Sequence, residues 1–174
     1  MEQQKIMTHI TKGLIIGLIA IVMGIAAYMG GFDQQSWYRW TSTLIMCGLI
    51  IWACIYYAQQ LDGRVTFGNV FAHGFKTSVV IALLIVVYFI LSTTVIFPEM
   101  KDKAIETARE QMEKDGKMSE EQINQGLEIA KKFFIAFGIG GVILGTLIAG
   151  AIASLIGAAA AKKKPVNPLD QLPS

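Results

Sequence analysis

Four long apolar stretches of this chain contain no charged residue, and they limit its fold more than any other feature. They cover residues 13–31, 41–58, 77–97 and 133–161. A helix rises about 1.5 Å per residue and the hydrocarbon layer of a bilayer is about 30 Å thick, so about 20 apolar residues cross it. The stretches therefore predict an all-α polytopic membrane protein with four transmembrane helices in a bundle.

Composition supports a membrane protein of one domain. Only 16% of the 174 residues are charged, whereas soluble domains average about 25%. The net charge of +2 is too small to indicate a nucleic-acid partner. We expect one membrane domain over residues 1–161 and a disordered basic tail over 162–174, which is rich in proline and poor in apolar residues.

Most of the charge lies between the third and fourth apolar stretches. Residues 98–132 hold seven basic and nine acidic side chains. Pro98 suits a first helical position, Gly116 suits a helix end, and Ser119 with Gln122 matches a capping box. We therefore expect a charged, water-exposed helical hairpin whose arms extend the third and fourth spans.

The connection before the third span has an aromatic helical face. Phe67, Val70, Phe71 and Phe75 recur at helical spacing, and Thr66 is placed to cap the start of a helix. This pattern predicts a short helix lying in the membrane interface. The alternative is that the third span begins early. The predicted interfacial residues are Asp62, Arg64, Thr66, Phe67, Gly68, Phe71, His73 and Gly74.

Small residues form regular rows on the first and fourth spans. Lipid is as apolar as leucine, so membrane helices associate through close packing, which small residues permit. Either the rows pack the four spans of one chain together, or one of them contacts a second copy or another membrane protein. The predicted packing residues are Gly13, Gly17, Ala20, Gly24, Ala27, Gly141, Gly145, Ala149, Ala153 and Gly157. Thr146, Gly150, Ser154 and Ala158 form a neighbouring row.

Recognisable catalytic chemistry is absent from the sequence. No Asp, Glu, Lys, Arg or His lies within the four expected spans, which argues against ion-coupled transport. There is no phosphate-binding, zinc-protease or serine-hydrolase motif. We expect no catalytic, cofactor or metal site and no enzyme activity. Asp62, Arg64 and His73 share one connection and are the only candidates for a polar cluster.

Orientation rests on the placement of charge. Lys5 and Lys12 precede a run longer than the core of a signal peptide, which predicts a retained anchor. Four spans place both termini on one side, with seven Lys and Arg residues there and eight on the other. Lys162–Lys164 follow the last span with no acidic neighbour and can meet anionic lipid headgroups. We therefore expect both termini to be cytoplasmic.

The second connection also carries a family resemblance. The run from Asp62 to Gly68, with Phe71 and Gly74, and the later Phe97, Pro98 and segment 116–121 resemble a bacterial membrane family, domain of unknown function 4199, common in Gram-negative Bacteroidota. The resemblance implies four spans and a bacterial inner membrane. It implies no activity, substrate or site residue.

Two functions fit these observations, ahead of a membrane enzyme that only Asp62, Arg64 and His73 could support. The first is a non-enzymatic interaction or accessory component of the inner membrane that acts through helix packing. The second is a passive pore or transporter subunit formed by oligomerisation. Its candidate lining groups are Ser92, Thr93, Thr94, Thr146 and Ser154.

Overall fold

The computed structural model describes residues 6–164 and is all-helical over that range. Its elements are α1 (His9–Gly30), α2 (Ser36–Gln60), α3 (Phe67–Leu91), the π-helical turn η1 (Ser92–Ile96), α4 (Met100–Asp115), α5 (Glu120–Lys132) and α6 (Phe134–Ala160). Within this range four helices are long and apolar enough to cross a membrane: α1, α2, α3 with η1, and α6. The predicted all-α fold with four membrane-spanning helices is confirmed.

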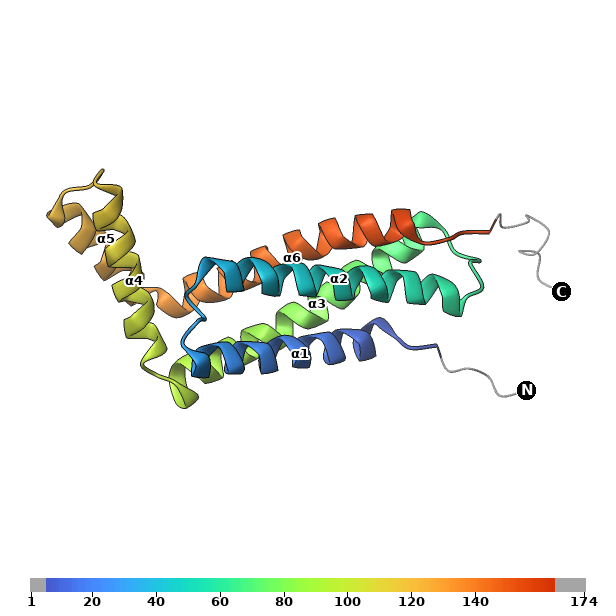
Figure 1. The fold of residues 1–174 in the computed structure, drawn as a ribbon, viewed down its shortest axis with the longest axis horizontal. Helices are drawn as coiled ribbons and strands as arrows, with labels where there is room; N and C mark the ends of the chain where they lie inside the picture. The colour runs from blue at the N-terminus through green and yellow to red at the C-terminus, as the bar shows by residue number, and fades with distance from the viewer. Residues whose placement is uncertain (1–5, 165–174) are drawn as a thin grey trace. The chain divides into compact units, whose positions relative to one another are not determined.

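The chain divides into two compact units. The four-helix unit comprises residues 6–85 and 145–164, and the hairpin unit comprises residues 86–144. The four-helix unit contains α1, α2, most of α3 and the C-terminal part of α6, which run alongside one another (Figure 1). The hairpin unit contains the end of α3, η1, α4, α5 and the start of α6.

Close approaches at glycine fix the directions of the helices in the four-helix unit. A Cβ atom added to Gly13 or Gly17 of α1 would lie 2.6 Å from Val80 or Leu84 of α3, so α1 and α3 run parallel. Gly157 of α6 meets Cys54 of α2 in the same way. The sulfur of Cys47 donates to the carbonyl of Ala149 at 3.9 Å, so α2 and α6 are also parallel.

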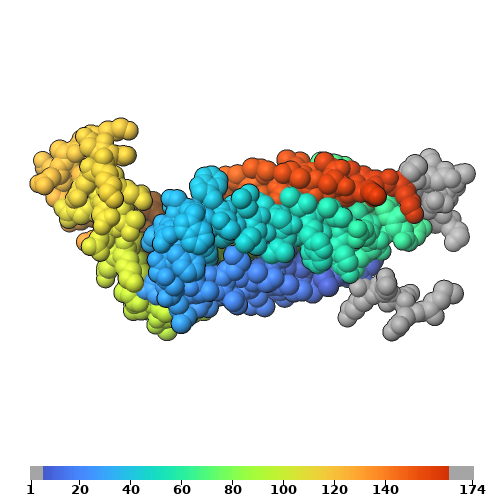
Figure 2. Space-filling model, in the orientation of Figure 1, coloured from blue at the N-terminus to red at the C-terminus, as the bar shows by residue number. Residues whose placement is uncertain are grey.

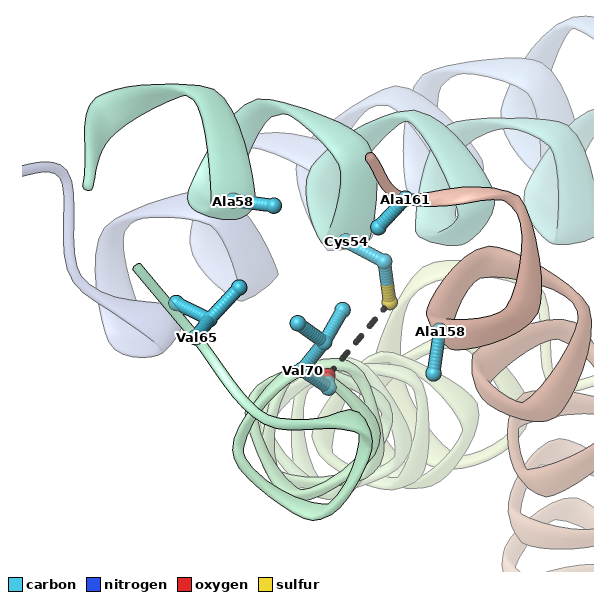
Figure 3. Close-up of a cluster of buried hydrophobic side chains, with 6 residues drawn as sticks. All are labelled: Cys54, Ala58, Val65, Val70, Ala158 and Ala161. Atoms are coloured by element: carbon cyan, nitrogen blue, oxygen red, sulfur yellow. Dashed lines mark hydrogen bonds between the residues drawn. The ribbon is translucent and has the colours of Figure 1, made fainter. Parts of the chain in front are cut away.

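The core of the four-helix unit has two layers. In the central layer, Ile16, Ile50, Ile81 and Ala153 bring all four helices together. The second layer lies where α2 and α6 end and α3 begins (Figure 3). Here the sulfur of Cys54 donates to the carbonyl of Val70 at 3.8 Å. Cys54, Ala58, Val65, Val70, Ala158 and Ala161 form this end cluster.

The outward faces of the spanning helices are apolar. Large side chains there are 40–70% exposed, including Leu18 of α1, Leu44 of α2, Leu83 of α3 and Ile152 of α6. A soluble protein rarely exposes so large an apolar surface, because water penalises it. In a bilayer the same side chains face lipid at no such cost.

The hairpin unit closes on its own small core. Ile105 of α4 packs with Ile123 and Leu127 of α5. The predicted end of α4 is confirmed: Gly116 adopts the left-handed conformation with φ 60°. The predicted capping box is also confirmed, because Ser119 accepts from the backbone of Gln122 and the Gln122 side chain accepts in return.

Three of the spanning helices, α1, α2 and α3, begin before the apolar stretches on which the spans were predicted. α1 begins at His9, where the Thr8 side chain accepts from the backbone of Thr11 at 3.2 Å. α3 begins at Phe67, and Thr66 accepts from Asn69 as expected of a cap. Backbone hydrogen bonding continues through polar residues that a hydropathy criterion excludes. The segment predicted to lie in the interface is therefore the first part of α3, continuous with its spanning part.

Candidate functional site: a buried lysine and histidine

The most unusual group in the four-helix unit is a buried lysine. Lys12 lies in the first turn of α1, and only 1% of its surface is exposed. The sequence places it beside Gly13 and one turn before Ile16, which are also buried. Because Lys12 shares the inward face of α1, its side chain enters the bundle.

Lys12 joins three helices through its ammonium group. Its Nζ atom lies 3.1 Å from the backbone carbonyl oxygen of Ala53 in α2, to which it donates. The same atom lies 3.2 Å from Nε2 of His73 in α3, which is 6% exposed. An ammonium group only donates hydrogen bonds. The Nε2 atom of His73 therefore accepts from the charged Lys12 when Nε2 carries no proton.

Aromatic rings surround these two side chains. The Tyr57 ring stacks on His73 with centroids 4.0 Å apart and planes 10° apart. The Lys12 ammonium lies 5.1 Å from the ring centre of Tyr56 and 5.6 Å from that of Tyr57. These distances allow cation–π attraction, which grows when water is excluded. The His9 ring meets His73 edge-on at 6.0 Å.

The arrangement holds charge without a carboxylate. Among residues 6–164, no acidic side chain forms an ion pair with Lys12. A carbonyl dipole, a histidine nitrogen and two ring faces stabilise the ammonium instead. The part of the chain that the structure describes also contains no group of three His, Cys, Asp or Glu side chains suited to a metal. The cluster is therefore a polar tie between α1, α2 and α3.

The structure corrects one premise of the sequence analysis. Ionisable side chains do lie within helices long enough to span the membrane, namely His9 and Lys12 in α1, Arg39 in α2, and His73 and Lys76 in α3. The expected spans ended at these residues because they are polar. Buried ionisable groups of the kind used in ion coupling are therefore present inside the bundle, at Lys12 and His73.

The predicted interfacial residues separate into two groups. Asp62 and Arg64 lie in the loop before α3 and form a long ion pair of 3.7 Å, with side chains 75% and 70% exposed. His73 instead contacts Lys12, His9 and Tyr57. The first turn of α3 carries Thr66 as its cap and exposed Phe67 and Gly68, while Phe71 stacks with Phe75.

Gly74 lies at a close crossing of three helices. A Cβ atom there would collide with the sulfur of Cys54 in α2 and lie 2.6 Å from the Ser154 hydroxyl of α6. Glycine is needed at this position because two neighbouring helices occupy the space of a side chain. Ser78 lies one turn after Gly74 in α3, and its side chain packs against Gly150 of α6.

The predicted packing rows divide between the interior and the outer surface. Gly13, Gly17 and Ala27 of α1 are buried, while Ala20 and Gly24 are half-buried. On α6, Ala153 and Gly157 are buried and Ala149 is half-buried. Gly141 and Gly145 are exposed, and a Cβ atom at either would meet nothing within 4 Å.

Lys12 is the functional candidate that sequence reasoning missed. The hydropathy pattern places it in the polar segment before the first span, although it immediately precedes the row of small residues. Carrying the helix back to the Thr8 cap would have placed Lys12 on the inward face. Its partner His73 could not be paired with it from sequence, because 61 positions separate them.

Comparison with known proteins gives one match. The model of a family described as a protein of unknown function, DUF4199, matches residues 11–163. The match covers the four spanning helices and the hairpin. No curated protein and no solved structure matches the chain.

Proposed function

The chain belongs to the DUF4199 family of proteins of unknown function, and we propose that it is a non-enzymatic interaction or accessory component of a membrane that acts through helix packing. The observation that carries the proposal is the exposed glycine surface of α6 at Gly141 and Gly145. At Gly74 and Gly150, in contrast, neighbours within the chain fill the space, whereas Gly48 and Gly140 are open as well.

An exposed glycine gives a second helix room to approach closely. Leu144 and Ile148 flank this surface and are 63% and 60% exposed, so Gly145 forms a depression between large side chains. Membrane helices pack most closely at such small residues, where backbones approach and dispersion contacts accumulate. The partner is either a second copy of the chain or a helix of another membrane protein.

Substitution of Gly145 tests this proposal. The variant Gly145→Leu fills the depression without a clash inside the chain, because the position is open. The matched control is Gly126→Leu, where a Cβ atom also meets nothing within 4 Å but which lies in α5, outside the spanning helices. Native mass spectrometry or crosslinking in mild detergent should find assembled wild-type protein and control, and a lower assembled fraction for Gly145→Leu. A strictly monomeric, partner-free wild-type protein would overturn the proposal.

Three of the five hydroxyl groups proposed to line a passive pore have local acceptors. Ser92 and Thr93 donate to the carbonyl of Phe89, and Thr94 donates to Ile90. Such bonds to the preceding turn are the usual way in which a helix satisfies its own hydroxyls. We therefore place the pore second, and flux of small solutes through liposomes containing the protein would favour it instead.

We further propose a bacterial inner membrane as the location, with both termini cytoplasmic. Four spans return the chain to its starting side. In support, Lys12 near the start of α1 contacts α2 only seven residues before its last residue, Gln60. The basic residues after α6 suit the anionic cytoplasmic leaflet.

A further inference from the structure

The three lysines after α6 are held in place by the loop between α2 and α3. The backbone N–H of Lys164 donates to the carbonyl of Gly63 at 2.9 Å. Gly63 has φ 76°, and a Cβ atom there would lie 3.1 Å from the carbonyl oxygen of Lys162. Residues 162–164 of the tail that was expected to be disordered are thus hydrogen-bonded and packed at the end of the four-helix unit, while 165–174 lie outside the described residues.

A groove lies between these lysines and α2, with a volume of about 510 Å³. Ile55 and Ala58 of α2 and Ala160 of α6 supply its apolar surface, while Lys162–Lys164 supply its basic edge. α2 and the C-terminal part of α6 lie side by side on the face seen in Figure 2. The groove thus combines an apolar wall with a cluster of positive charge.

Among the residues that the structure describes, no acidic side chain is paired with the lysines of this groove. Asp62 also lines the groove, but it pairs with Arg64. The Lys163 ammonium lies 5.2 Å from the ring centre of Phe67. Within residues 6–164, no acidic side chain forms an ion pair with Lys162, Lys163 or Lys164. The three ammonium groups are therefore available to an anionic ligand.

The groove lies where two spanning helices end. α2 ends at Gln60 and α6 ends at Ala160, so the lysines that follow α6 are placed at the depth of the lipid headgroups. Ile55 lies more than one turn before the end of α2 and is therefore closer to the acyl chains. We propose that this groove binds an anionic phospholipid, with its phosphate against the lysines and the upper part of an acyl chain against Ile55 and Ala58. This inference requires the membrane location but no helix-mediated partner.

The physical basis is a match on both halves of the lipid. Lysines close to an anionic headgroup gain Coulomb energy, and the apolar wall loses water when an acyl chain covers it. The headgroup of a zwitterionic lipid carries its own cationic group, which the three lysines repel, so this lipid is bound less well. Free inorganic phosphate lacks the acyl chain and cannot use the apolar wall.

The experiment compares lipids bound to the full-length protein by native mass spectrometry. Protein in mild detergent is titrated with phosphatidylglycerol or with phosphatidylcholine of the same acyl chains. We expect phosphatidylglycerol to bind at least about tenfold more tightly. A tenfold excess of inorganic phosphate over the lipid should not displace it. Equal binding of the two lipids, or displacement by phosphate, would overturn the proposal.

Three triple variants locate the site. Lys162, Lys163 and Lys164 are changed together to Gln, and phosphatidylglycerol affinity should fall at least about tenfold. Changing the same three residues to Arg keeps the charge and should keep the affinity, which separates a lost contact from a lost fold. The control with equal charge loss changes Lys101, Lys117 and Lys131 of the hairpin unit to Gln and should bind like wild type.

The variants also give results that would overturn the proposal. An equal loss of lipid in the hairpin control would mean that only net charge matters. An arginine variant that fails to bind while remaining folded by circular dichroism would exclude a charge-based site. Lipid is counted on the monomer peak and assembly on the oligomer peaks, so failure here is distinct from failure of the proposed packing function.

Discussion

The ammonium nitrogen of Lys12 lies 3.2 Å from Nε2 of His73, so a polar contact joins the first turn of α1 to α3 within the bundle. Polar groups inside a membrane protein are costly unless partnered, and those that persist usually have a structural or functional role. Here the contact sits beside the close packing of Gly13 against Val80. Together, the polar contact and the glycine packing fix the position of α1 along the axis of α3.

The first prediction concerns the two members of this contact. Lys12→Met should change the free energy of unfolding by no more than about 1 kcal/mol, because it removes a buried charge together with its bonds. His73→Ala should lower it by about 2–3 kcal/mol, because the ammonium loses its acceptor and Tyr57 loses its stacked ring. Unfolding in increasing sodium dodecyl sulfate, followed by circular dichroism, measures both.

A matched control and a double variant separate the contact from ring burial. His9→Ala removes a ring that meets His73 only edge-on, so its cost should stay below about 0.5 kcal/mol. In the Lys12→Met background, His73→Ala should cost about 1–2 kcal/mol less than in wild type. If His73→Ala cost the same in both backgrounds, the contact would not be coupled as described.

The second prediction compares two glycines that a sequence pattern cannot distinguish. Gly74→Ala should destabilise the protein by about 1–3 kcal/mol, because the new methyl group meets Cys54 and Ser154. Gly145→Ala meets nothing within 4 Å and gains up to about 1 kcal/mol of helix propensity. The same denaturation measurement should therefore give shifts of opposite sign. Equal destabilisation by the two changes would contradict the packing at Gly74.

The spans could be predicted from sequence because lipid imposes one strong condition. An uncharged run of about 20 residues has few alternatives to a transmembrane helix. The same condition is silent about where a helix ends. Thr8 and Thr66 cap helices that then run through His9, Lys12 and His73 before reaching the apolar core.

The turn between the two helices of the hairpin unit could also be predicted, because its signals are local in sequence. A helix cap depends on a few adjacent residues, so Gly116 and Ser119 could be assigned without knowledge of the fold. The polar tie could not, because Lys12 and His73 meet only after α1 and α3 pack in parallel. Likewise the spacing of glycines does not say which ones face a neighbour, as Gly74 and Gly145 demonstrate.

The third prediction tests the turn of the hairpin unit. Gly116 has φ 60° and Ser119 caps α5. Gly116→Ala places a residue with a Cβ atom in the left-handed conformation, which should lower the free energy of unfolding by about 1 kcal/mol. Ser119→Ala removes the cap of α5 and should lower it by a similar amount. Hydrogen exchange of the full-length protein should show faster exchange in the first turn of α5 for Ser119→Ala.

The control for the hairpin is Thr107→Ala, a half-buried position in the middle of α4 whose hydroxyl donates to the carbonyl of Lys103 one turn earlier. It should leave exchange in α5 unchanged. Protection of the first turn of α5 that was the same in Ser119→Ala as in wild type would contradict the observed capping box.

The fourth prediction tests the proposed orientation with two matched substitutions. Lys117→Cys lies in the turn between α4 and α5, and Lys164→Cys lies after α6; both remove one exposed lysine. The native thiols give little background because Cys54 is buried and Cys47 is half-buried within α2. A membrane-impermeant maleimide added to intact spheroplasts should label Cys at 117 but not at 164, since one complete span separates them. Permeabilised cells should label both, and inverted vesicles should reverse the pattern.

Labelling of 164 but not 117 from outside would place the termini on the other face and separate the lysine groove from the anionic cytoplasmic leaflet. Labelling of both positions from outside would contradict passage of α6 through the membrane.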